Sequence, residues 1–288
     1  MMPRMPEDRR RRAPKGARGA TMVRILLGCL LLGGVAVGSG CASDSGASAQ
    51  PRTFADAAER LYQAAQTDLK KGNTLEAISQ FNALRNTFPY SKYAPLAELG
   101  IGDAYFAQES YATAVQQYRS FVQLHPSHAK VAYAQWRVAD AFYQLMPEDW
   151  WLLPPAYERN LRKTEDAVRE LDRFAKAYPQ SEYAAEANKR LGIARRRLAD
   201  HELYVAKFYF ERDNPKAAGM RLRYLLKNYS GLGLDPQALF LLARSYIELG
   251  ELPRAQTALN DLIKYHPNSD LAGKARDYLR RYNLDKKG

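Results

Sequence analysis

Cysteine is almost absent from this 288-residue sequence, which has two, Cys29 and Cys41, and none after residue 41. A disulfide therefore cannot stabilise the rest of the chain. A long hydrophobic run is also missing, because the apolar segment at residues 25–37 is too short and too glycine-rich for a membrane span. The fold must therefore be stabilised by the packing of side chains in the remaining chain.

Histidine is scarce, and catalytic motifs are lacking. The four histidines are His125, His128, His201 and His266. Two of them precede proline at predicted helix ends, and none is paired with a second ligand at metal-site spacing. No phosphate-binding glycine loop, nucleophile elbow or catalytic Ser/His/Asp arrangement is present. We therefore predict no metal site, no cofactor and no enzymatic activity.

The first 53 residues lie outside the predicted fold. A short basic segment after Met22 leads into the apolar run, and small residues follow before Cys41, an order typical of a secretory signal peptide. Residues 1–40 are predicted to be removed, with Met22 as the expected true start. Residues 41–53, rich in Ser, Ala and Gly, are expected to form a flexible linker.

Cys41 resembles the acylated cysteine of a bacterial lipobox, although Gly38 stands where that motif usually has Leu. Cys29 fits the short motif better, but almost no apolar region precedes it. Cys41 is thus the predicted lipidation site, and several acyl chains together give a durable membrane anchor. By resemblance to lipoproteins of two-membrane bacteria, Ala42 at the next position favours export to the outer membrane, facing the periplasm.

The basic excess of the sequence lies largely in the segment predicted to be removed. The formal net charge of +12 falls to +6 without residues 1–40, which carry the run Arg9 to Arg12. The remaining bias fits acidic partners or phospholipid head groups. It does not indicate a nucleic-acid partner.

A recurring pattern fills the rest of the chain: an Ala, bulky apolar residues four and seven positions later, and a helix stop at the twelfth. The five instances are Ala77/Phe81/Leu84/Pro89, Ala114/Tyr118/Phe121/Pro126, Ala167/Leu171/Phe174/Pro179, Ala218/Leu222/Leu225/Ser230 and Ala255/Leu259/Leu262/Pro267. Offsets of 0, 4 and 7 share one face of a helix. A fixed period of this kind predicts an all-α stack of helical hairpins rather than one closed core.

A second set of small residues precedes each instance, namely Ala65, Gly102, Ala139, Ala206 and Ala243. An aromatic follows three residues later in four of the five units. Small residues facing each other let two antiparallel helices pack closely, so the pattern resembles tetratricopeptide repeats, with roughly ten to eleven helices. Four stops are followed within two residues by Ser, which we expect to cap the next helix.

The spacing of the repeats is irregular, at 37, 53, 51 and 37 residues between the pattern alanines. The second gap holds an insertion at residues 146–160, which includes Trp150 and Trp151 and is either a structural plug or a partner-contacting loop. The third gap, residues 181–212, has no proline and predicts one long helix. It would separate N-terminal repeats 1–3 (residues 54–180) from C-terminal repeats 4–5 and a terminal helix (residues 181–288).

These features together resemble the BamD family of outer-membrane protein assembly lipoproteins. The most specific stretch is residues 187–212, which looks like the family's long helix, and the resemblance spans residues 54 to about 282. It implies a lipid-anchored, non-enzymatic scaffold. The implied partners are a BamA-like barrel subunit, other assembly lipoproteins and unfolded outer-membrane proteins.

The resemblance also implies two sites. Arg221, with Arg223 beside it, matches the position of a family arginine at the barrel-subunit contact. The N-terminal repeats would form the substrate groove, whose candidate lining residues are Tyr62, Gln66, Tyr105 and Tyr143. Aromatics at such positions offer apolar contact at low entropic cost, although they also suit a packed core.

Two other interpretations remain. A different envelope lipoprotein with the same repeats, such as a pilus-assembly pilotin or a cell-envelope division coordinator, is the alternative, although its more regular spacing or coiled coil fits less well. The helical part of a lytic transglycosylase would need a catalytic domain, and the repeats leave no room for one.

Overall fold

A computed structural model of the chain describes residues 53–148, 155–158 and 161–285, and these residues form eleven α-helices, one short 3-10 helix and no strand. The predicted all-α fold and helix number are confirmed. The elements are α1 (Phe54–Lys70), α2 (Thr74–Thr87), α3 (Ala94–Ala107), α4 (Tyr111–Leu124), α5 (Val131–Gln144), η1 (Ala156–Glu158), α6 (Arg162–Ala177), α7 (Ala184–Phe210), α8 (Pro215–Asn228), α9 (Asp235–Glu248), α10 (Leu252–Tyr265) and α11 (Asp270–Arg281).

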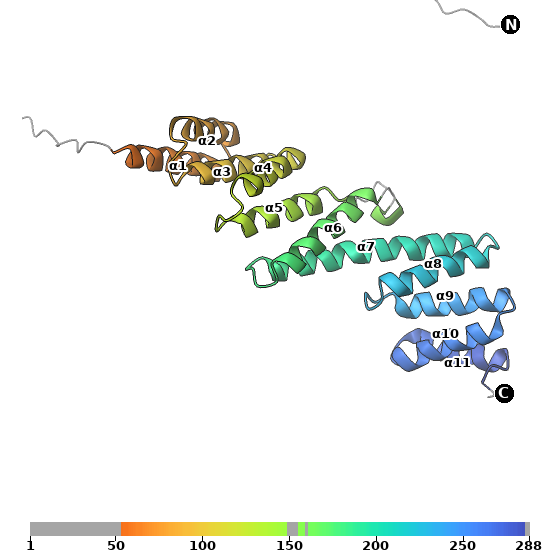
Figure 1. Cartoon of the computed structure of the whole chain (residues 1–288). Coiled ribbons are helices and arrows are strands. Elements are labelled where there is room, and N and C mark those ends of the chain that lie inside the picture. The colour runs from red at the N-terminus through yellow and green to blue at the C-terminus, as the bar shows by residue number, and fades with distance from the viewer. Residues whose placement is uncertain (1–52, 149–154, 159–160, 286–288) are drawn as a thin grey trace, which may run out of the picture. The chain divides into compact units, whose positions relative to one another are not determined.

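Each α-helix packs against the next one in the chain (Figure 1). Five hairpins result, with α1, α3, α5, α7 and α9 as first helices and α2, α4, α6, α8 and α10 as second helices. First helices also contact one another directly, as α5 does with α7 and α7 with α9, and the terminal helix α11 contacts α9. Residues on one face of successive first helices can therefore act together.

The residues of the repeat pattern form the core. All fifteen alanines and apolar residues at offsets 0, 4 and 7 are at most 2% exposed. Burying a Leu or Phe side chain contributes about 1.5–3 kcal/mol each, so this face of the second helices supplies much of the stability. The small residues of the first helices are buried as well, and a Cβ at Gly102 would lie 2.7 Å from Cε1 of Tyr118. The predicted close approach of the paired helices is confirmed.

The second helices end where the pattern predicts. Each stops two residues before the Pro or Ser of the twelfth position, as α2 does at Thr87 before Pro89. The residue before proline takes a non-helical conformation, with φ −126° and ψ 53° at Phe88.

The predicted serine caps are wrong in three of four cases. Ser269 is the N-cap of α11 and its Oγ accepts from Leu271 N–H at 3.3 Å. After the other predicted helix ends, a tight turn precedes the next helix. In the turn between α2 and α3, Ser91 N–H donates to the Phe88 carbonyl at 3.0 Å. The next helix then starts three residues later, with Tyr93 as a cap that has no side-chain hydrogen bond. Ser127 and Ser181 stand in equivalent turns.

The long helix is confirmed as α7, which has 27 residues and packs against both α6 and α8. The described part of the insertion lies on it. Arg197 donates to the Pro147 carbonyl, His201 Nδ1 contacts the Tyr157 carbonyl, and the Tyr157 ring lies 5.7 Å from that of Tyr204. The insertion tryptophans, Cys41 and the predicted signal and linker lie outside the described residues, Thr53 excepted.

Candidate partner-binding surfaces

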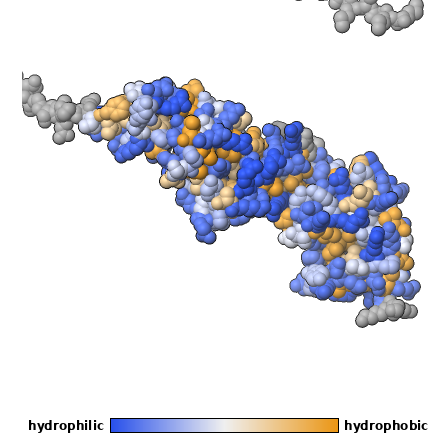
Figure 2. Space-filling model, viewed as in Figure 1, coloured by the Kyte–Doolittle hydropathy of each residue, from blue (hydrophilic) through white to orange (hydrophobic). Residues whose placement is uncertain are grey.

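The face of the molecule drawn in Figure 2 is mainly hydrophilic, with apolar residues in separate patches. In the described part of the chain no helix is long and apolar enough to cross a membrane. No group of three metal-ligating side chains is found among the described residues either. The predicted partner-binding residues lie on the first helices α1, α3 and α5 and on α8.

Two of the predicted groove residues lie together on α1. Gln66 Nε2 donates to the Tyr62 hydroxyl at 3.2 Å, and the Tyr62 ring stacks on Tyr93 at 5.3 Å between centroids. Both predicted residues are half-buried. They form a small polar and aromatic surface next to the start of α3.

The other two predicted groove residues lie on α3 and α5. Tyr105 packs, half-buried, against the apolar clusters on either side of α3. Tyr143 belongs to the next hairpin, where the Arg190 guanidinium lies over its ring at 4.9 Å. The structure therefore brings Tyr62 and Gln66 into direct contact and packs Tyr62 and Tyr105 against one apolar cluster, whereas Tyr143 lies on the next hairpin.

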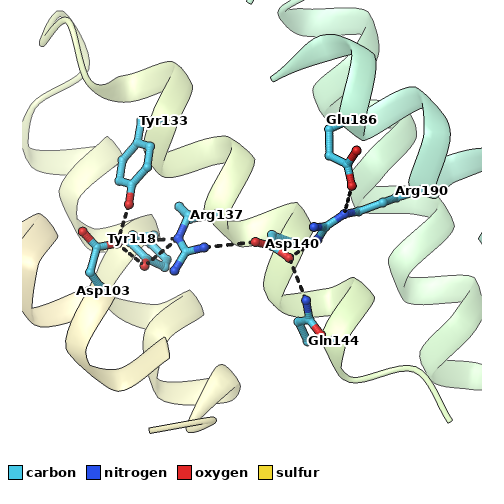
Figure 3. A network of polar contacts seen from close by, with 8 residues as sticks. All are labelled: Asp103, Tyr118, Tyr133, Arg137, Asp140, Gln144, Glu186 and Arg190. Carbon is cyan, nitrogen blue, oxygen red and sulfur yellow. Dashed lines mark hydrogen bonds and ion pairs between the residues drawn. The ribbon is translucent and has the colours of Figure 1, made fainter. Parts of the chain in front are cut away.

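A network of polar side chains crosses α3, α4, α5 and α7 (Figure 3). At its α3 end, the hydroxyls of Tyr118 and Tyr133 both donate to Asp103 Oδ1, at 2.6 and 2.7 Å. Arg137 Nε donates to the Tyr118 hydroxyl at 3.2 Å and lies 3.6 Å from Asp103 Oδ1. The Arg137 guanidinium also stacks over Phe106, 3.6 Å from the ring centroid.

Asp140 joins this end of the network to the long helix. Its side chain is 6% exposed and accepts from Arg137 at 3.0 Å, from Gln144 at 3.3 Å and from Arg190 on α7. Arg190 also donates to Glu186 at 2.8 Å. One carboxylate thus couples the third hairpin to α7.

The protonation states in the network follow from burial and from the neighbouring charges. Burial raises the pKa of Tyr118 and of Tyr133 far above the ordinary value of 10, and the Asp103 carboxylate raises both further. Burial acts to lower the pKa of Arg137, but Tyr118, Tyr133 and Asp103 outweigh it and the pKa is raised. The hydroxyls therefore remain donors, and the guanidinium remains charged.

Arg221 lies on α8 at the edge of a pocket of about 510 Å³ between α6, α7 and α8. Its side chain is 46% exposed, and Nη1 reaches Glu202 Oε2 on α7 at only 3.4 Å. His201 and Tyr224 line the same pocket. The arginine is accessible and loosely paired with a largely buried carboxylate.

Arg223 does not share that pocket. It lies two residues further on, so it faces the other side of α8, where Nη1 donates to the Tyr246 hydroxyl at 3.3 Å. It lines a separate pocket of about 310 Å³ with Arg254 and Asp261. The resemblance placed the two arginines at one site, but they lie in different pockets.

The fold and these surfaces define a class: a helical-hairpin repeat scaffold that presents side chains to other molecules. Within that class, residues 55–262 match the family described as YfiO, outer membrane lipoprotein. This match covers more than two thirds of the sequence, and the chain belongs to that family.

Relatives whose names state a function are similar at low identity. The outer membrane protein assembly factor BamD of Caulobacter vibrioides is 25% identical over 80% of this chain and 74% of its own. The BamD of Vibrio cholerae is 27% identical over 77% of this chain and 93% of its own. That of Rickettsia prowazekii is 26% identical over 85% of this chain and 92% of its own. Among solved structures, the TPR2AB domain of yeast Sti1 in complex with pHSP90 is 15% identical over 79% of this chain and 86% of its own, with a TM-score of 0.40.

Proposed function

We propose that this protein is a lipid-anchored scaffold subunit of an outer-membrane protein assembly machine. The family match over residues 55–262 and the relatives named as outer membrane protein assembly factors support the proposal. The prediction that the chain is not an enzyme is confirmed, because assembly factors of this family are scaffolds. The proposal includes the removal of residues 1–40, a linker at 41–53, and two groups of repeats at 54–180 and 181–288.

The observation that carries the proposed partner contact is the position of Arg221. An exposed guanidinium only loosely paired within the chain, at 3.4 Å from Glu202, can also accept the approach of a carboxylate on another protein. We assign the pocket around it to a BamA-like barrel subunit. Tyr62, Gln66, Tyr105 and Tyr143 on the N-terminal first helices are proposed to contact unfolded outer-membrane proteins.

We expect Arg221→Glu to weaken binding to the purified periplasmic domains of the barrel subunit by at least about tenfold, because a paired charge becomes a repulsive one. Binding is measured by calorimetry. The control is Arg280→Glu on α11, which reverses a more exposed charge in an ion pair with Asp277. Since the new carboxylate also faces Glu202, Arg221→Gln is measured in parallel. Unchanged affinity in both Arg221 variants would refute the contact.

We expect Cys41→Ala to release the protein from membranes into the soluble periplasmic fraction, since the acyl chains would be lost. Membrane fractionation in cells that lack the barrel subunit measures this, with Cys29→Ala as the control that stays membrane-bound. Continued membrane retention of the Cys41 variant would show that another anchor exists.

The broader function is tested by extracting the native protein in mild detergent and identifying its stoichiometric partners by mass spectrometry. Recovery of an outer-membrane barrel protein with periplasmic repeat domains supports the assembly function. Recovery of a pilus secretin or of peptidoglycan synthases instead leaves the fold in place and replaces the function.

A further inference from the structure

The end of the first hairpin carries two strongly exposed aromatic side chains. Phe54 begins α1 and is 58% exposed, and Tyr90, in the turn after α2, is 97% exposed. Both adjoin Phe88, which is half-buried at the end of α2. The Phe88 ring lies 4.6 Å from the Phe54 ring, and Tyr90 follows it by two residues. We call these three residues the aromatic end.

Tyr90 departs from the repeat pattern. The residue directly after the helix stop is Tyr90 in the first unit, and it is Ser127, Gln180, Gly231 or Asn268 in the other four. Those four residues are small or polar, as suits a turn in water. Nearly all of the Tyr90 side chain is exposed, so packing within its own unit does not explain the aromatic ring. The unit that departs is the one nearest in the sequence to the predicted lipid anchor.

The length of chain before α1 limits how far the aromatic end can lie from a membrane. Residues 42–53 separate Cys41 from Phe54. A chain of that length spans at most about 45 Å, even when it is fully extended. Acylation of Cys41 would therefore keep the aromatic end at a high local concentration next to the bilayer.

The chemistry of the aromatic end fits the interface of a bilayer. Aromatic side chains are enriched where hydrocarbon meets head groups, and a Tyr hydroxyl can stay hydrated there. The exposed charges beside the aromatic end have both signs, with Asp56 in the first turn of α1 and Lys92 two residues after Tyr90. Contact with lipid would therefore depend on apolar burial more than on the charge of the head groups.

We propose that the aromatic end docks on the phospholipid bilayer that anchors the protein, with Phe54 and Tyr90 among the head groups. The proposal rests on the lipid anchor at Cys41 and extends it, because a second contact fixes the orientation of the first repeats at the membrane. Two aromatic side chains bury less apolar surface than one acyl chain, which alone gives only marginal membrane binding. The docking thus orients an anchored protein and does not retain the Cys41→Ala variant.

The test fixes the anchor chemically, so that it does not depend on natural acylation. A chain of residues 41–288 contains every described residue and has Cys41 as its only cysteine. This thiol is coupled to a maleimide phospholipid in vesicles of phosphatidylethanolamine and phosphatidylglycerol. Hydrogen exchange at residues 88–92 is measured by mass spectrometry and compared with that of the uncoupled chain. We expect at least about threefold slower exchange in the coupled chain, as contact for two thirds of the time gives.

Two double variants test the aromatic side chains themselves. Phe54→Ser combined with Tyr90→Ser should abolish the slower exchange, because the apolar contact is lost. Tyr90→Ser combined with Ser127→Tyr is the matched control, since it keeps the composition and moves the exposed tyrosine to the equivalent turn of the second unit. This control should not restore the protection that Tyr90 gives to residues 88–92.

The proposal is overturned if coupling leaves the exchange at residues 88–92 unchanged, or if the double serine variant is protected as the parent is. Protection that rises with the density of coupled protein would overturn it as well, because it would indicate contact with a second copy. Protection that appears only when an unfolded outer-membrane protein is added would assign the surface to that substrate instead. None of these results bears on the fractionation of the Cys41→Ala variant, so the anchor and the docking surface are tested separately.

Discussion

Gly100→Ala is expected to destabilise the N-terminal repeats by about 2 kcal/mol, because a methyl group is forced into a full core. An added Cβ would lie 2.6 Å from Cε2 of Phe81, and that ring is fully buried on α2. The ring cannot move away without displacing Leu84 and Ala97 in the same cluster. Hydrogen exchange at the amides of α2 and α3 measures the destabilisation where it occurs, since a helical array need not unfold in one step.

The same substitution at Gly192 is the matched control. Gly192 also lies inside a helix, α7, but a Cβ there meets nothing within 4 Å. Ala at position 192 adds only its higher helix propensity, and we expect it to increase the free energy of unfolding by about 0.5–1 kcal/mol. If both variants changed stability in the same direction, packing against Phe81 would not be the reason that position 100 is glycine.

The periodic part of the fold could be predicted from the sequence because the same spacing of Ala and apolar residues recurs in every repeat. Ala, Leu and Phe at offsets 0, 4 and 7 can share only one helical face, and that face is buried in all five units. The long helix followed from a lack of proline between residues 181 and 212. The starts of the helices were harder, because the tight turn before Tyr93 leaves Ser91 outside the helix.

The polar network was missed because its members are far apart in the chain. Asp103 and Arg190 are separated by three intervening α-helices, and no local motif connects them. A signal was nevertheless present, since Asp103 and Asp140 each follow the small residue of their unit. Comparing that single position across the repeats would have shown the acidic pair.

Asp140→Ala is expected to reduce stability by about 2–3 kcal/mol, because two half-buried arginines would each lose one charged hydrogen-bond acceptor. Arg137 and Arg190 are each 19% exposed, so water can solvate them only in part. Arg137 would retain Asp103, and Arg190 would retain Glu186, which contact them from α3 and from α7 itself. The ion pair between α5 and α7 would be removed, and the faster hydrogen exchange should therefore appear in α5 and in the first half of α7.

Two further variants separate this explanation from a general effect of removing an acid. Asp277→Ala removes a carboxylate that is 67% exposed and pairs with Arg280 on the same helix, and it should change stability by less than about 0.5 kcal/mol. Arg190→Met combined with Asp140→Ala removes both members of the ion pair between α5 and α7. The double variant should then be destabilised by less than the sum of the two single effects. Strict additivity would mean that Asp140 and Arg190 act independently, and the coupling of the third hairpin to the long helix would have to come from the other contacts between them, such as Asp172 with Arg195.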